Sequence, residues 1–172
     1  GLGLRGYIVN SNLRYRADII YQGGSTYNLV LNGVSEAATI SAMAALANVT
    51  YNLPVLRDYD SQLTAEVAAG SGDADSSRMT NASQSNTEGS YTAFHNFGSY
   101  SGGLALKPRL ANMQIVRLGT YFRPLKPNFM LRNLAVQLKY SYYRKSVATG
   151  GISDPAATQA SNDVGHAGDL AL

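Results

Sequence analysis

The chain has 172 residues and a formal net charge of +3, and only 15% of its residues are charged, against roughly 25% in typical soluble domains. It contains no cysteine, which excludes disulfide frameworks, thiol catalysis and cysteine-ligated zinc. Its 14 basic residues are spread along the chain, so no nucleic-acid-binding patch is indicated. Only two histidines are present, and we expect no catalytic residue, no metal site and no cofactor.

The first residues read GLGLRGYIV without an initiator methionine, and the last ones read as the middle of a strand. We therefore expect a segment of a longer polypeptide, with residues 1–172 as a single unit. An uncharged stretch from Ala37 to Leu56 has about the length of a membrane helix. Its polar residues and Pro54 argue against that interpretation.

Strand-like alternation begins early in the chain. Between residues 13 and 22, apolar side chains alternate with Arg14, Arg16 and Asp18, so one face of a strand is apolar and the other ionic. Similar patterns, clear in the first three cases and weaker in the rest, predict strands at 63–70, 114–122, 134–143, 4–9, 27–31, 40–53 and from about 164.

The segment from Ser35 to Asn48 allows two interpretations. Ser35 is a suitable N-cap and the alanines after it favour a helix. A strand followed by a loop fits the same residues. Either element is compatible with an all-β fold, because a short helix can lie within a barrel loop.

The predicted connections alternate in length. Residues 53–61 and 123–128 form short connections, whereas the polar stretches at about 72–107 and 147–163 are long. An up-and-down barrel with tight turns at one end and large loops at the other produces this alternation. A compact soluble domain has few unstructured connections of such length.

A soluble β-sandwich also alternates apolar and polar side chains. Strands of about nine residues, an ionic face opposite an aliphatic one, and aromatic residues near strand ends favour a membrane barrel instead. The aromatic residues in question are Tyr51, Phe122, Phe129, Tyr140, Tyr142 and Tyr143. The predicted fold is therefore all-β, an antiparallel up-and-down transmembrane β-barrel of which this chain is an incomplete segment.

Four short segments follow one another in a recognisable order along the chain. They read YNLP at 51–54 followed by LTAEVAAGSGD at 63–73, NMQIVRLGTYFRP at 112–124, the strand at 134–143, and VGHAGDL at 164–170. Their order and spacing, over roughly residues 40–172, resemble the alginate-export family of outer-membrane barrels. One departure is Ala167-Gly168, where that family has a bulky and an acidic residue.

The resemblance implies a barrel of about eighteen strands in the bacterial outer membrane, which passes an anionic polysaccharide through a basic pore. Its expected partners are outer-membrane lipid and an anionic solute or polysaccharide, with periplasmic proteins as further candidates and no nucleic acid. Because a lipid-spanning sheet cannot leave strand edges unpaired, strands beyond the seven or eight visible here are needed.

If the aliphatic faces contact lipid, the opposite faces line the pore. The candidate pore-lining residues are the basic Arg14, Arg16, Arg117 and Lys139 and the acidic Asp18 and Glu66. Rings of arginine and lysine favour anions, and the planar guanidinium matches a carboxylate. The alternative is a structural ladder in which Arg16, Asp18 and Glu66 pair across strands.

Two other functions remain open at this point. A barrel can sheathe a multihaem cytochrome, and any haem would then belong to the partner, because this chain has no Cys-x-x-Cys-His motif. A soluble β-sandwich binding module is the second alternative. Asp73 and Asp75 could supply oxygen ligands to calcium, although a solvated loop explains them more simply.

Overall fold

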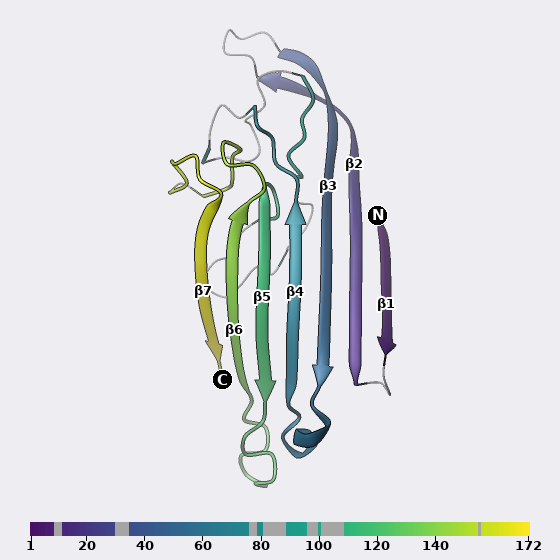
Figure 1. Cartoon of the computed structure of the whole chain (residues 1–172), viewed down its shortest axis with the longest axis vertical. Coiled ribbons are helices and arrows are strands. Elements are labelled where there is room, and N and C mark those ends of the chain that lie inside the picture. Colours follow the sequence, from purple (N-terminus) through teal and green to yellow (C-terminus); the bar gives the residue numbers. More distant parts are fainter. Residues whose placement is uncertain are drawn as a thin grey trace.

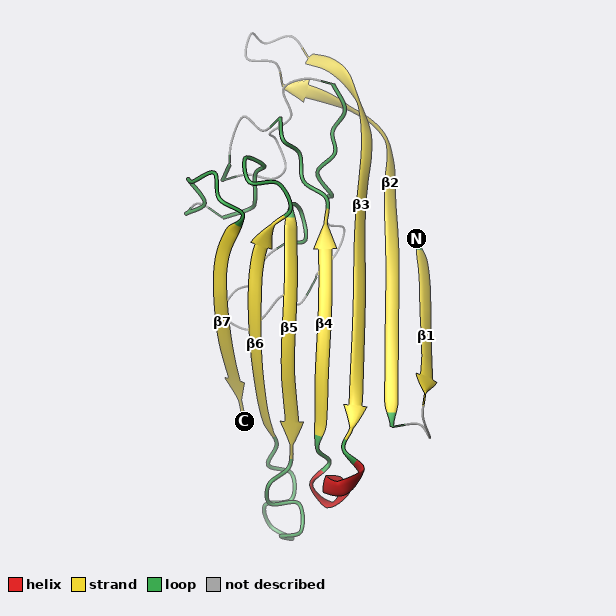
Figure 2. Cartoon of the chain, in the orientation of Figure 1, coloured by secondary structure: helices red, strands yellow, loops and turns green. Residues whose placement is uncertain are grey.

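The computed structural model is one antiparallel sheet whose seven strands follow sequence order (Figures 1 and 2). The strands are β1 (Leu2–Ile8), β2 (Leu13–Leu29), β3 (Ser35–Asn52), β4 (Gln62–Gly70), β5 (Met113–Phe122), β6 (Val136–Lys145) and β7 (Asp163–Ala171), with a 3-10 helix η1 (Pro54–Tyr59) between β3 and β4. The structure describes residues 1–8, 12–29, 35–75, 79–80, 89–95, 100, 109–154 and 156–172. This order confirms the predicted all-β, up-and-down arrangement.

The sheet is open. Among the described residues, β1 pairs only with β2 and β7 only with β6. Strands β4 to β7 have nine or ten residues each, the length at which a tilted strand crosses a bilayer. A sheet in lipid has no unpaired edges, so these strands correspond to part of a barrel wall. No helix in the described ranges is long and apolar enough to span a membrane.

The β2–β3 hairpin is longer than predicted. Residues 35–52 form one continuous strand, so a helix after Ser35 is wrong, and the pattern near Tyr27 belongs to the end of β2. Pairing runs from Leu13 opposite Tyr51 to Leu29 opposite Ser35. This ladder pairs β3 with β2 along nearly its whole length, and its hydrogen bonds outweigh the helix propensity of the alanines. Residues 30 and 31 of the predicted strand lie outside the described residues.

The two ends of the sheet differ. At the short-turn end, residues 53–61 and 123–135 connect the strands, and Asp60 holds the two connections together through Arg123 and Lys126 at 3.3 and 2.6 Å. At the long-loop end, residues 71–112 and 146–162 connect the strands, and the β2–β3 hairpin extends past its neighbours (Figure 1). The 3-10 helix within the first short connection was not predicted (Figure 2).

In a soluble sheet the aliphatic side chains are buried and the charged ones exposed, and this sheet shows the reverse at its middle. Arg117 is 8% exposed whereas its neighbour Leu118 is 56% exposed. The same outer face carries exposed aliphatic side chains on four strands, among them Leu63, Val67, Val116, Leu138 and Leu170. A β-sandwich needs two packed sheets, and the described residues form one. We call the aliphatic side the outer face and the Arg117 side the inner face.

Candidate functional site

A polar row crosses the inner face at mid-height. Its members are successive cross-strand partners from β1 to β6: Arg5, Arg16, Asn48, Glu66, Arg117 and Ser141. Residues directly opposite one another in a ladder lie on the same face. The row therefore brings together polar side chains that are up to 136 positions apart, from position 5 to position 141.

The β4–β6 half of this row is neutralised internally. Arg117 Nη1 donates to Glu66 Oε1 at 3.0 Å, and Arg117 Nε donates to Ser141 Oγ at 3.2 Å. Asn48 Nδ2 donates to the other oxygen of Glu66 at 3.4 Å. The Arg117 and Glu66 side chains are only 10% and 17% exposed. A buried guanidinium needs such a partner, because an unpaired charge in this setting is costly.

Tyr100 covers this pair from the long β4–β5 loop. Its hydroxyl donates to Glu66 Oε1 at 2.6 Å, and its ring centroid lies 5.8 Å from the Arg117 guanidinium carbon. Burial raises the pKa of Tyr100 above its ordinary value, and the hydrogen bond to Glu66 raises that pKa further. The hydroxyl therefore remains protonated and keeps donating to the carboxylate.

The β1–β2 half of the row is open and basic. Arg5 lies directly opposite Arg16, and Arg14 is the next inner-face residue of β2. Arg16 forms an ion pair with Asp18 on its own strand, and its side chain is 50% exposed. Like charges on opposing strand positions repel each other. These three guanidiniums, with one carboxylate beside them, are suited to accept an anion.

The GSGD motif, which begins at Gly70, anchors the long loop that follows it. Ser71 Oγ donates to the Thr92 carbonyl at 2.7 Å, and Asp73 Oδ2 accepts from the Thr92 N–H at 2.9 Å. The Leu110 carbonyl approaches so closely that a Cβ on Gly70 would lie 1.9 Å from its oxygen. The motif thus ties Thr92, in the middle of the loop, and Leu110, near its far end, to the top of β4.

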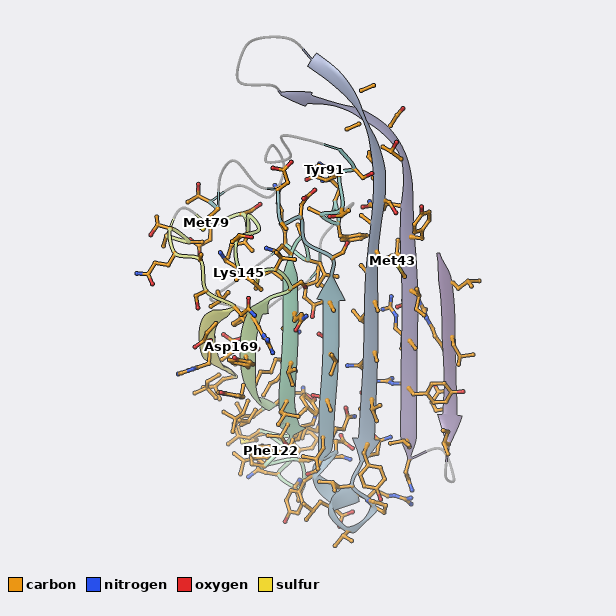
Figure 3. The ribbon with its side chains drawn as sticks, turned by 45° about the horizontal axis from the view of Figure 1, so that its top comes forward. Met43, Met79, Tyr91, Phe122, Lys145 and Asp169 are labelled. Atoms are coloured by element: carbon orange, nitrogen blue, oxygen red, sulfur yellow. The ribbon has the colours of Figure 1, made fainter. Side chains whose placement is uncertain are left out.

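The loop then crosses to β2 and β3. Tyr91 donates its N–H to the Thr39 carbonyl at 2.8 Å and accepts from the Ser41 N–H at 3.0 Å. His95 and Gln22 exchange two hydrogen bonds, at 2.6 and 2.7 Å. Figure 3 shows Tyr91 beside the upper part of the β2–β3 hairpin. The loop therefore folds back over the inner face.

This cover creates an apolar core on the upper part of the inner face, which was predicted to be polar and charged. Ile115 and Tyr143 on the strands pack with Phe94 and Leu110 of the loop, each 5% exposed or less. The prediction that Tyr143 belongs to an aromatic girdle is wrong, because its ring lies in this core. Apolar residues point inward here because the loop shields them from water.

Asn112 joins the two long loops. Its Nδ2 donates to the Val147 carbonyl at 3.0 Å, and its Oδ1 accepts from the Val147 N–H at 2.8 Å. The residue is fully buried and has a positive φ of 55°, a conformation that asparagine tolerates well. A Cβ on Gly72 or on Gly150 would clash with its side chain.

The structure brings the predicted pore-lining residues together in two pairs. Glu66 pairs with Arg117 across strands, whereas Arg16 pairs with Asp18 along one strand. The predicted ladder of Arg16, Asp18 and Glu66 does not form, because Asn48 stands between Arg16 and Glu66 in the register.

The remaining two predicted residues lie one row nearer the short-turn end. Arg14 is exposed on the inner face opposite Thr50, and Lys139 lies opposite the buried Asp169 across β6 and β7. Figure 3 labels Asp169 on β7. Within the described ranges, no group of three or more His, Asp or Glu residues could hold a metal ion.

Sequence reasoning missed Arg5 and Tyr100. The alternation of Leu2, Leu4 and Ile8 places Arg5 on the polar face, but the pattern is short and interrupted by glycines. Tyr100 lies in a polar stretch without periodicity, and its contact with Glu66 spans 34 positions. No local signal in the sequence indicates such a contact.

Two comparisons with known proteins bear on identity. The sequence model of the family described as alginate export matches residues 1–172. The four short motifs span a smaller part of the chain, roughly residues 40–172. No curated protein matches the chain. The family is one of outer-membrane transport channels and not of enzymes, in agreement with the all-β sheet and its aliphatic outer face. The chain belongs to the alginate export family.

Proposed function

We propose that this chain forms part of the wall of a bacterial outer-membrane channel that passes hydrophilic anions, and in particular an anionic polysaccharide. The observation that carries the proposal is the open cluster of Arg5, Arg14 and Arg16 on the inner face. It lies behind an outer face of exposed aliphatic side chains that suits lipid.

The balance of charge on the inner face supports anion passage. Among the strand side chains that the structure describes there, six are basic and three acidic, a net charge of +3. They are Arg5, Arg14, Arg16, Arg117, Lys139 and Lys145 against Asp18, Glu66 and Asp169. In a narrow pore with low-dielectric walls such an excess raises the local anion concentration.

The basic residues have two different roles in this proposal. Arg14 and Arg16 contact the solute directly, because both are exposed and their guanidiniums can bind carboxylates through paired hydrogen bonds. Arg117 and Lys139 contribute mainly to the overall potential, because each faces a carboxylate across a strand pair. Contacts at an exposed cluster are weak enough to release a moving polymer, which conduction requires.

The orientation follows from the connections. Outer-membrane barrels have short turns in the periplasm and long loops outside. The short-turn end, with residues 53–61 and 123–135, therefore faces the periplasm, and the docked β4–β5 loop narrows the external side. Flow through such a pore follows the gradient, and no residue is assigned a catalytic role.

The decisive test is ion selectivity. The native polypeptide that contains this chain is purified in mild detergent, inserted into planar bilayers, and its reversal potential is measured across a KCl gradient. We expect a chloride-selective pore and faster gel migration before boiling than after. A cation-selective pore would overturn the proposal. Haem absorbance in the purified complex would favour the cytochrome sheath.

A further inference from the structure

A polar cavity of about 400 Å³ opens on the inner face at the short-turn end. Asn52, Gln62 and Tyr121 line it and form one cross-strand row where β3, β4 and β5 meet the turns. Arg57, Asp60 and Arg123, from the two short connections, supply the charged part of the lining. The cavity therefore lies at the mouth that we assign to the periplasm.

Its lining is already organised by contacts within the protein. Arg123 Nε donates to Tyr121 Oη at 2.9 Å, and Arg123 Nη1 donates to Asp60 Oδ2 at 3.3 Å. Lys126 Nζ donates to the other oxygen of Asp60 at 2.6 Å. One carboxylate is thus shared by two cations, and Arg57 adds a further positive charge. The cavity keeps a net positive charge.

The polar groups match a carboxylated sugar. Each side-chain amide offers both donors and an acceptor, as adjacent sugar hydroxyls require. Guanidiniums bind a planar carboxylate through two parallel hydrogen bonds, and a tyrosine ring supplies a flat apolar surface. A volume of about 400 Å³ is at the small end of ligand sites, which suits one or two sugar residues.

We propose that this cavity, the mouth site, binds a hexuronate residue of the polysaccharide as it enters the channel. The proposal rests on the function proposed above and adds a place of first contact. Along β3, Asn52 is four residues from Asn48 in the polar row, a distance of roughly 13 Å at the usual strand rise. A chain held at the mouth site therefore reaches the arginine cluster with its next residues.

The test is transient block of single-channel current by trigalacturonate, with neutral maltotriose as the comparison sugar. In the native polypeptide we expect trigalacturonate to block more often from the short-turn side than from the other side. The double variant R57Q/Q62A should reduce block frequency about tenfold, because charge-assisted contacts are lost. The matched control is R109Q, an exposed arginine at the long-loop end.

The outcomes separate the two proposals. A wild-type pore without anion selectivity would overturn the proposed function. An anion-selective pore in which R57Q/Q62A and R109Q are blocked equally, or in which maltotriose blocks as well as trigalacturonate, would overturn the mouth site alone. If the double variant fails the unboiled gel shift, the single variant N52A provides the same comparison.

Discussion

The two halves of the polar row place the same residue type in opposite settings. Arg117, in the β4–β6 half, is 8% exposed and contacts Glu66, Ser141 and Tyr100. Arg16, in the β1–β2 half, is half-exposed, pairs with Asp18 on its own strand, and faces another arginine. The difference teaches that an arginine on the inner face is structural or open to solvent according to its cover, and not according to its charge.

The largest effect is expected when the covered half of the row loses its Glu66–Arg117 ion pair. E66A leaves the Arg117 guanidinium buried without its counter-ion, and we expect a loss of about 3 kcal/mol in the free energy of unfolding. Urea titration in detergent micelles measures it. The matched variant D18A removes the carboxylate beside the half-exposed Arg16 and should cost less than about 1 kcal/mol. Equal losses would contradict the comparison.

The second prediction concerns the open half. R5Q/R16Q removes two facing charges, so chloride selectivity should fall toward that of an uncharged pore while stability is kept or slightly raised, because repulsion is relieved. Reversal potentials check the selectivity. R132Q is the control, since Arg132 stacks on Phe129 at 5.2 Å in a short connection. A change of equal size in R132Q would count against the cluster.

A smaller effect is expected at the cover itself. Y100F keeps the ring over Arg117 and loses only the hydrogen bond to Glu66, which should cost about 1 kcal/mol in unfolding free energy. Y100A also removes the ring and should increase single-channel conductance, because the covered half then opens to solute. If Y100F and Y100A had identical conductance, the ring would have no role in covering the pair.

The smallest effect is a change with pH at the loop. Burial, reinforced by Asp73, raises the pKa of Tyr91 from 10.0 to about 12. The folded state therefore favours the neutral hydroxyl, and its stabilising contribution is complete below pH 10 and lost as the pH rises through about 12. Conductance recorded over this range should change in the native channel and change less in Y91F.

Much of the sheet follows from period-two patterning. The alternation in β4, β5 and β6 predicted one face for Glu66, Arg117 and Lys139, and the register of the sheet brings these three residues to one face. Glu66 and Arg117 were placed on the same face, but their pairing depends on a register between strands separated by a long loop. The continuous β3 was ambiguous, since its alanines favour a helix and only pairing with β2 decides.

The candidate site was less predictable for the same physical reason. Whether an arginine is covered or open depends on where residues 91–95 and Tyr100 contact the sheet, and polar loops carry no periodic signal. The mouth site combines residues from β3, β4, β5 and two turns. Such a combination exists only once the topology is known.

The contacts of the β4–β5 loop also indicate the order in which parts of the chain fold. The loop forms hydrogen bonds with Gln22 and Thr39, which lie on strands that precede it in the chain. Asn112, at the far end of the loop, forms hydrogen bonds with Val147, which follows β6. The loop therefore acquires its full set of contacts only after β2 to β6 have paired. Because such non-local contacts form slowly, we expect the loop to dock on the sheet late in folding.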